Sequence, residues 1–291
     1  MRLFKLLSII LLSTTLNAQN NFPYKLTKVF ETSGFDRPES VIRDTKNKLI
    51  FVSNQDGGMT EKNGTGYISK LKLNGEIIEK KWITGINGPK GMAIYKNILY
   101  VSDIDVIVAI NIKTKEVKRY PVQGTIHLND VTVDKRGNIY VSEILASHKI
   151  YMLSKGKVSV FIQNKEIENP NGLYAYKGNL YVGTSGSKKD PVTYESKIPG
   201  SLFKINLKNK TITKITKPFA GIDGVEKTKN GFFMSDWLKG KIYYYSKKTK
   251  QISEALNLSR GTADIDYDRK SKMLYIPMMI EGKVLAYKMC K

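Results

Sequence analysis

Six polar residues recur at one place in a repeated sequence motif. The first copy reads Pro38-Glu39-Ser40-Val41, and later copies place Lys90, Asn129, Asn171, Asp223 and Asp264 where the first has Glu39. Five of the six side chains carry oxygen atoms, and carboxylate and amide oxygens are the ligands that Ca²⁺ and Mg²⁺ prefer. Asp and Asn also begin turns, so each could simply cap its own turn. Because all six share one register, we interpret them as parts of one site.

The residues around these positions predict short strands. Each motif precedes a first strand and then a second one rich in β-branched and aromatic residues, such as Leu49–Ser53 and Leu99–Asp103. Third strands are expected at 66–73, 106–112, 149–153, 201–207, 241–245 and 283–288, and more polar fourth strands at 77–83, 116–122, 158–162, 211–217 and 251–256. The motif positions lie 51, 39, 42, 52 and 41 residues apart. Such spacing is typical of four-stranded propeller blades, so we predict an all-β, six-bladed β-propeller.

The ends of the chain support this architecture. The sixth repeat has no fourth strand because the chain ends at Lys291, while a spare strand pattern at 24–31 precedes the first repeat. We expect this N-terminal strand to close the last blade, which removes an open sheet edge. A β-sandwich or an open solenoid explains neither feature. The predicted propeller is one domain spanning residues 19–291.

Residues 1–18 have the pattern of a secretory signal peptide. Arg2 and Lys5 precede an apolar run at 6–12, and Ala18 ends a segment of small and polar residues. A buried first helix or a membrane anchor is the alternative, but the segment is short for a membrane span. We expect cleavage near Ala18, a periplasmic or secreted mature protein, and no transmembrane segment. The lone Cys290 cannot form an intrachain disulfide.

The chain is strongly basic, with a formal net charge of +22. Most of the excess is Lys, which lies in turns such as 44–48 and 246–250. Nucleic-acid readers usually cluster Arg and aromatic residues on one face, so we expect no nucleic-acid partner. The preferred interpretation is a solvated Lys-rich surface. Weak attraction to anionic polysaccharide or membrane surfaces is the alternative.

In a propeller the first strand of each blade lines the central channel, so the six positions should ring one channel mouth. The long segments 55–65 and 185–200 should emerge on the same face, either as a lid from both sides or as ordinary surface loops. His127 precedes Asn129 by two residues and could touch a substrate, whereas His148 is expected at a surface or turn position. The sequence has no cluster of His or Cys residues that could form a structural zinc site. It also has no Ser, His and Asp in an order that would place them together as a catalytic triad.

With these features, the whole mature chain resembles the regucalcin/gluconolactonase family of six-bladed propellers. The resemblance rests on the order of the blades and on the Pro170-Asn171-Gly172-Leu173 and Asp223-Gly224 turns. It implies one divalent metal ion held by Glu39, Asn129, Asn171 and Asp223, with Lys90 and Asp264 at unused positions. Ca²⁺ is the expected ion, with Mg²⁺, Mn²⁺ or Zn²⁺ as alternatives. The family usually has Gly-Pro after its first-blade Glu and Arg where this chain has His127, and both differences concern the substrate shell.

The resemblance further implies a metal-dependent hydrolase that opens a sugar lactone or related ester. The metal would polarise the carbonyl, and Asp223 would be the catalytic base toward water. His127 and Lys90 would bind a polyhydroxylated or anionic substrate. The alternative is a non-catalytic propeller that binds a glycan, a peptide or an anionic surface.

Overall fold

The computed structural model describes residues 22–145 and 148–291. The predicted signal peptide, residues 1–18, lies outside the described residues. The described chain contains 26 strands and one short 3₁₀ turn, η1 (Lys165–Ile167), which confirms the all-β prediction. In these two segments no helix is long and apolar enough to cross a membrane.

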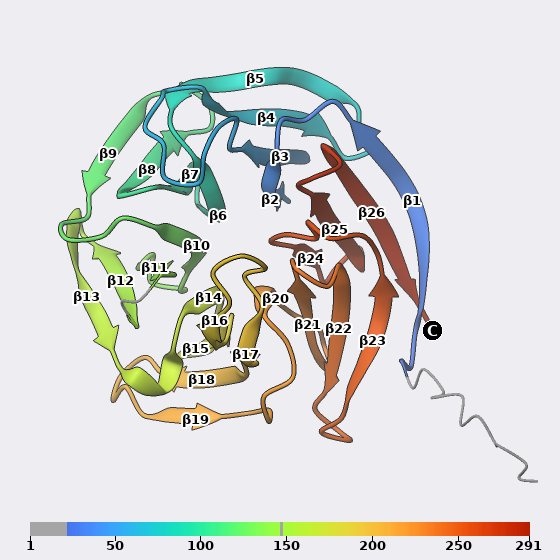
Figure 1. Cartoon of the computed structure of the whole chain (residues 1–291). Coiled ribbons are helices and arrows are strands. Elements are labelled where there is room, and N and C mark those ends of the chain that lie inside the picture. Colours follow the sequence, from blue (N-terminus) through green and yellow to red (C-terminus); the bar gives the residue numbers. More distant parts are fainter. Residues whose placement is uncertain (1–21, 146–147) are drawn as a thin grey trace, which may run out of the picture.

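Six four-stranded sheets are arranged around a central axis (Figure 1). From the inner to the outer strand, the first blade consists of β2 (Pro38–Asp44), β3 (Leu49–Asn54), β4 (Gly66–Lys72) and β5 (Ile77–Ile86), and the second of β6 (Pro89–Tyr95), β7 (Ile98–Asp103), β8 (Val106–Asn111) and β9 (Val117–Pro121). The third blade consists of β10 (Leu128–Val133), β11 (Ile139–Glu143), β12 (Lys149–Ser154) and β13 (Lys157–Gln163), and the fourth of β14 (Pro170–Tyr176), β15 (Asn179–Thr184), β18 (Leu202–Asn206) and β19 (Ile212–Lys214). The fifth blade consists of β20 (Ile222–Lys227), β21 (Gly231–Asp236), β22 (Lys241–Ser246) and β23 (Ile252–Asn257), and the sixth of β24 (Asp266–Asp268), β25 (Met273–Met278), β26 (Lys283–Cys290) and β1 (Lys25–Ser33). All neighbouring strands pair antiparallel. The six-bladed propeller is therefore confirmed.

The N-terminal strand closes the ring as predicted. β1 pairs with β26 from Lys25 opposite Cys290 to Ser33 opposite Lys283, and forms the outer strand of the last blade. In Figure 1 the blue strand β1 runs alongside the red strand β26 at the perimeter. The last sheet thus joins the two ends of the described chain and covers the edge that β26 would otherwise expose.

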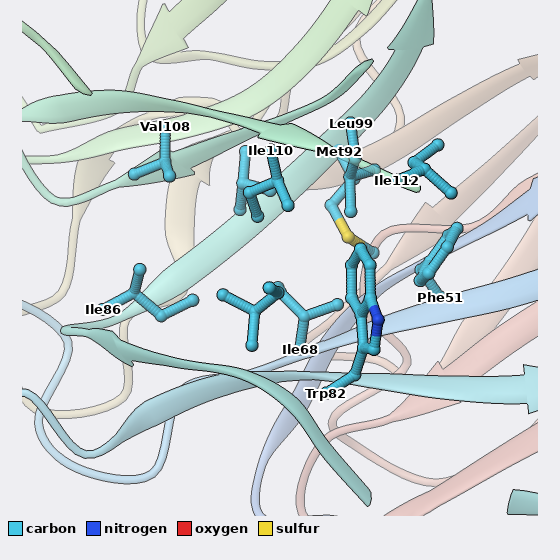
Figure 2. Packing of buried hydrophobic residues seen from close by; sticks show 11 residues of the cluster. Phe51, Ile68, Trp82, Ile86, Met92, Leu99, Val108, Ile110 and Ile112 are labelled. Atoms are coloured by element: carbon cyan, nitrogen blue, oxygen red, sulfur yellow. The ribbon is translucent and has the colours of Figure 1, made fainter. Parts of the chain in front are cut away.

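Apolar side chains from neighbouring blades pack against one another and form the core between them. Between the first two blades, Trp82 of β5 lies against Phe51 of β3 with ring centroids 4.7 Å apart. Met92 and Leu99 of the second blade belong to the same buried cluster (Figure 2). Because each blade buries its faces against two neighbours, the ring is one continuous unit rather than a row of separate sheets.

Two elements differ from the sequence-based expectation. The fourth strand of the fourth blade was expected over 211–217 but is only the three-residue β19, since Ile215 and Thr216 both donate their N–H groups to the Leu202 carbonyl in an irregular turn. The sixth motif position, Asp264, lies before the short strand β24 instead of beginning a strand. Its backbone N–H donates to the Glu39 carbonyl at 3.0 Å, so this segment attaches to the first blade as well as to its own.

Candidate metal site at the channel mouth

A β-bulge presents the motif side chain in five of the six blades. The pairing of the first with the second strand shifts register between Pro38 and Ser40, and at the matching place in the next four blades. A bulge inserts an extra residue and changes the direction of the side chains beside it. The bulged segments contain Glu39, Lys90, Asn129, Asn171 and Asp223. The strand-to-strand geometry therefore places a polar side chain at the matching position in each of these five blades.

Serines in the second strands hold these bulges. Ser142 Oγ accepts a hydrogen bond from the Asp130 N–H at 3.0 Å, and Ser235 Oγ accepts one from the Gly224 N–H at 2.7 Å. Ser53 does the same for the Ser40 N–H at 2.9 Å. Each bond satisfies a buried N–H that the irregular pairing leaves without a ladder partner. The recurring serine in the second strands is thus a sequence signal for the bulge.

Glycine after the motif residue lets neighbouring inner strands approach. A Cβ atom added to Gly172 would lie 2.4 Å from the Asp223 carbonyl oxygen, and one on Gly224 would lie 2.7 Å from Asp264 Oδ1. Neither distance is compatible with a side chain at these positions. The close approach brings the fourth, fifth and sixth motif residues together around the axis.

Three of the four predicted ligands form one hydrogen-bonded chain. Asn129 Nδ2 donates to Asn171 Oδ1, and Asn171 Nδ2 donates to Asp223 Oδ1 at 2.6 Å. All three side chains are buried. Burial raises the pKa of Asp223 to about 6, although the hydrogen bond from Asn171 opposes the shift. These residues come from β10, β14 and β20, three consecutive blades.

Glu39 faces the same region from the first blade. Its side chain is buried, and Oε2 has no hydrogen-bond partner. Burial, together with the neighbouring Asp223 and Asp264 carboxyls, raises the pKa of Glu39 well above its ordinary value, while Lys90 lowers it. The structure therefore places Glu39 close enough to Asp223 for the two carboxyl groups to interact electrostatically.

Lys90 and His127 are buried beside these oxygens. Lys90 Nζ donates to the carbonyls of Gly88 and Met59, each at 3.1 Å, and burial lowers its pKa. His127 is buried with no partner for Nδ1. Burial, with the charges of Lys90 and Lys189, lowers the pKa of His127 to about 3, so its imidazole is neutral near pH 7.

Both long insertions reach the mouth, but in different ways. The segment 55–65 leans onto the second blade, where the Met59 carbonyl binds Lys90 and Lys62 pairs with Asp105 at 2.5 Å. The other insertion forms a hairpin of β16 (Ser187–Lys189) and β17 (Ser196–Ile198), drawn near β14 and β20 in Figure 1. Lys189 of this hairpin interacts electrostatically with Asp223. Lys189 cannot be singled out from the sequence, because the chemical role of a lysine in an insertion depends on where the hairpin folds.

A second layer of carboxyl groups lies below the mouth. Asp130, Glu226, Asp264 and Asp266 line a cavity of about 780 Å³ that continues along the channel away from the mouth. Burial raises the pKa of all four, to about 8 for Asp264 and about 6 for Asp266, and repulsion from neighbouring carboxyls adds to the shift of Asp130, Glu226 and Asp264. Asp130 follows Asn129 directly, and only the bulge brings both side chains to the channel. Strand alternation alone would have placed them on opposite faces.

The predicted ligand set is chemically suited to a hard divalent cation. It offers two carboxylates and two amide oxygens, and the partnerless Oε2 of Glu39 is an oxygen that a bound cation would satisfy. Within residues 22–145 and 148–291, no group of three or more His, Cys, Asp and Glu is arranged to hold a metal. Any metal at the mouth therefore depends on the two asparagines as well as on the acids.

Two solved structures share the fold. A streptogramin B lyase matches with a TM-score of 0.62 at 13% sequence identity, over 91% of this chain and 98% of that one. A selenomethionine-substituted virginiamycin B lyase from Staphylococcus aureus matches with a TM-score of 0.60 at 16% identity, over 91% of this chain and 99% of that one. At these identities the likeness shows the fold alone. No family model and no curated protein matches the sequence.

Proposed function

We propose that this propeller is a metal-dependent hydrolase that opens a lactone or a related ester at the channel mouth. The observation that carries the proposal is the convergence of Glu39, Asn129, Asn171 and Asp223 at one buried place beneath two insertions. Four oxygen-bearing side chains around an axis suit a divalent cation that the protein coordinates from one side. The other side of the cation would then be accessible to solvent and substrate. The regucalcin/gluconolactonase resemblance supports the same reaction class.

Some side chains of the site would bind the cation and the substrate, and Asp223 would also transfer the proton. A divalent cation, when bound, supplies Lewis-acid polarisation of a carbonyl. Asp223 accepts a proton from the attacking water, whose oxygen bonds to the carbonyl carbon. The bond from that carbon to the ring or ester oxygen then breaks, and the proton passes to the departing oxygen. The products are a carboxylic acid and a hydroxyl group.

Three further groups fit a role in substrate binding. Lys90 and Lys189 place two amines beside the oxygens, and neither pairs with a carboxylate within 4.0 Å among the described residues. His127 remains neutral and can donate or accept a hydrogen bond. This set favours a polyhydroxylated or anionic substrate. The two structural neighbours are named as lyases, so the same fold carries catalysis in those proteins.

Turnover of a panel of aldonolactones and aryl esters tests the proposal directly. We expect hydrolysis only with Ca²⁺, Mg²⁺, Mn²⁺ or Zn²⁺ added after chelation, and a loss of at least about a hundredfold in kcat for Asp223→Asn. Asp190→Asn is the matched control, because Asp190 is a partly exposed carboxylate at the hairpin tip between β16 and β17. Metal-independent turnover, or equal rates in both variants, would refute the proposal.

A non-catalytic binding protein is the second candidate, and the unpaired amines Lys90 and Lys189 favour it. It predicts that polyhydroxylated carboxylates bind with micromolar to millimolar affinity but are never converted. Calorimetric binding without any product, over the same panel and metals, would favour this candidate.

A further inference from the structure

The propeller has two faces, and its topology decides which connections lie on each. The inner strand of every blade runs away from the mouth, so the turns from first to second strand and from third to fourth strand lie on the opposite face. Eleven such turns exist in the described chain, from 45–48 of the first blade to 269–272 of the last. We call them together the basic face. The remaining connections, including both insertions, lie at the mouth.

Charge is divided unequally between these faces. The eleven turns of the basic face contain eighteen Lys and Arg residues, and their only acidic residues are Glu76, Glu116 and Asp134. The described mouth connections contain nine basic and ten acidic residues. Lysines that are spread along the sequence are therefore gathered on one side by the fold.

These charges are available to a partner. All eighteen basic side chains are exposed. Among the described residues, only Lys115 of this set pairs with a carboxylate, Glu79 at 2.8 Å. Like charges gathered on one face repel one another, and an anionic partner would relieve that repulsion.

The distribution of the charges indicates the shape of the partner. Basic residues occur in turns of all six blades, so they extend around the whole ring. A single linear polymer crossing the ring would reach only part of them, whereas a flat surface would reach them together. Sixteen of the eighteen are Lys, a hydrated point charge suited to diffuse attraction rather than to bidentate recognition. None of the exposed large hydrophobic residues of the described chain lies in these turns, so nothing there would insert into a lipid core.

We propose that the basic face docks electrostatically on an anionic lipid bilayer. Each Lys or Arg near such a surface contributes to binding, and the attraction decays within a Debye length. Docking in this way leaves the channel mouth turned toward solvent, where a soluble ligand can enter. The inference is independent of the reaction at the mouth, since it uses none of the residues there.

Vesicle co-sedimentation of the protein, from residue 22 onward, tests this docking. Vesicles of equimolar phosphatidylglycerol and phosphatidylcholine should bind the protein at low ionic strength and release it in high salt, while pure phosphatidylcholine should not bind. The triple variant Lys248→Gln, Lys250→Gln, Lys270→Gln removes three exposed charges from two neighbouring turns. We expect its affinity for the anionic vesicles to fall about tenfold or more.

The matched control removes three exposed charges from the mouth connections by Lys188→Gln, Lys197→Gln and Lys239→Gln. It has the same net charge as the first triple variant, and its vesicle affinity should fall less than about threefold. Equal losses in the two variants would assign binding to net charge alone and overturn the proposal. Binding to an acidic polysaccharide or to DNA without binding to the anionic vesicles would overturn it as well.

Discussion

At the scale of single residues, the mouth is a place where charges are buried close together. Glu39 and Asp223 repel each other there, and the Lys90 ammonium offsets part of that repulsion. A cation bound at the mouth would offset the repulsion between Glu39 and Asp223 more directly. Lys90 and a metal ion therefore compete for the same negative charge.

This competition predicts the effect of Lys90→Met, which keeps the length of the side chain and removes its charge. We expect divalent-metal affinity to rise about threefold to tenfold, because the ammonium no longer repels the cation. Titration calorimetry with Ca²⁺ and Mn²⁺ measures the change. Lys62→Met, an exposed lysine of the same face paired with Asp105, should leave the affinity within about twofold. Unchanged affinity in Lys90→Met would contradict this account of the mouth.

Below the mouth, Asp266 predicts a pH dependence of stability. Its folded pKa of about 6 exceeds the ordinary value of 3.8, so between these pH values the folded chain holds a proton that the unfolded chain releases. The free energy of unfolding should therefore fall as pH rises through this interval. Asp266→Asn keeps an acceptor for the Arg43 N–H and removes the titration, so its profile should be flatter between pH 4 and 6.

Urea denaturation at half-unit pH steps measures both profiles. Asp190→Asn is the control, because backbone hydrogen bonds from Thr193 and Val192 lower the pKa of Asp190 and give a shift of the opposite sign. A wild-type slope that Asp266→Asn leaves unchanged would show that Asp266 is not titrating in this interval.

At the scale of strands, the site depends on how closely the inner strands approach. Gly172→Ala places a methyl group against the Asp223 backbone, so a strand must shift. We expect a loss of about 1–3 kcal/mol in the free energy of unfolding, together with weaker metal binding. At Gly221 a Cβ would meet its nearest atom at 3.5 Å, and Gly221→Ala should change both quantities little. Equal behaviour of the two variants in urea melts and in calorimetry would exclude close strand approach as the cause.

The closing strand provides a second test at this scale. A chain that begins at residue 34 lacks β1 and leaves the edge of β26 uncovered along eight paired positions. We expect it to aggregate and to lose its cooperative thermal transition. A chain that begins at residue 22 keeps β1 and should remain monodisperse. Size-exclusion chromatography with light scattering distinguishes the two, and a monodisperse, cooperatively folded chain from residue 34 would contradict closure by β1.

Strand positions were largely predictable, because turn residues and the alternation of short apolar runs with polar turns are local properties of the sequence. The six copies of the motif that begins with Glu39 predicted the number of blades, and the spare strand at 24–31 indicated how the ring closes. The shortened β19 was not predictable, since its end depends on hydrogen bonds of 215–216 to Leu202. Asp130 and Lys189 were missed for a related reason. Their positions follow from a bulge and from a folded hairpin, which no local pattern specifies.

At the scale of the whole molecule, the ring places the candidate metal site on one face and most of the exposed lysines on the other. One face carries a buried polar site covered by insertions, and the other carries an excess of exposed Lys. The separation follows from topology, because the turns from first to second and from third to fourth strand lie on one face, whereas the turns from second to third strand and the blade connections lie on the other. The lysines are scattered along the sequence, and only the closed ring brings them to one face.

The proposed function requires that the mouth binds a divalent cation through Glu39, Asn129, Asn171 and Asp223. Isothermal titration of the chelator-treated protein with Ca²⁺, Mg²⁺, Mn²⁺ and Zn²⁺ tests it most directly, with Asp223→Ala compared under the same conditions. We expect one ion bound per chain in the wild type, and binding at least about a hundredfold weaker in the variant because half of the ligand charge is lost. No binding of any of the four ions to the wild type, or equal binding to both proteins, would contradict it.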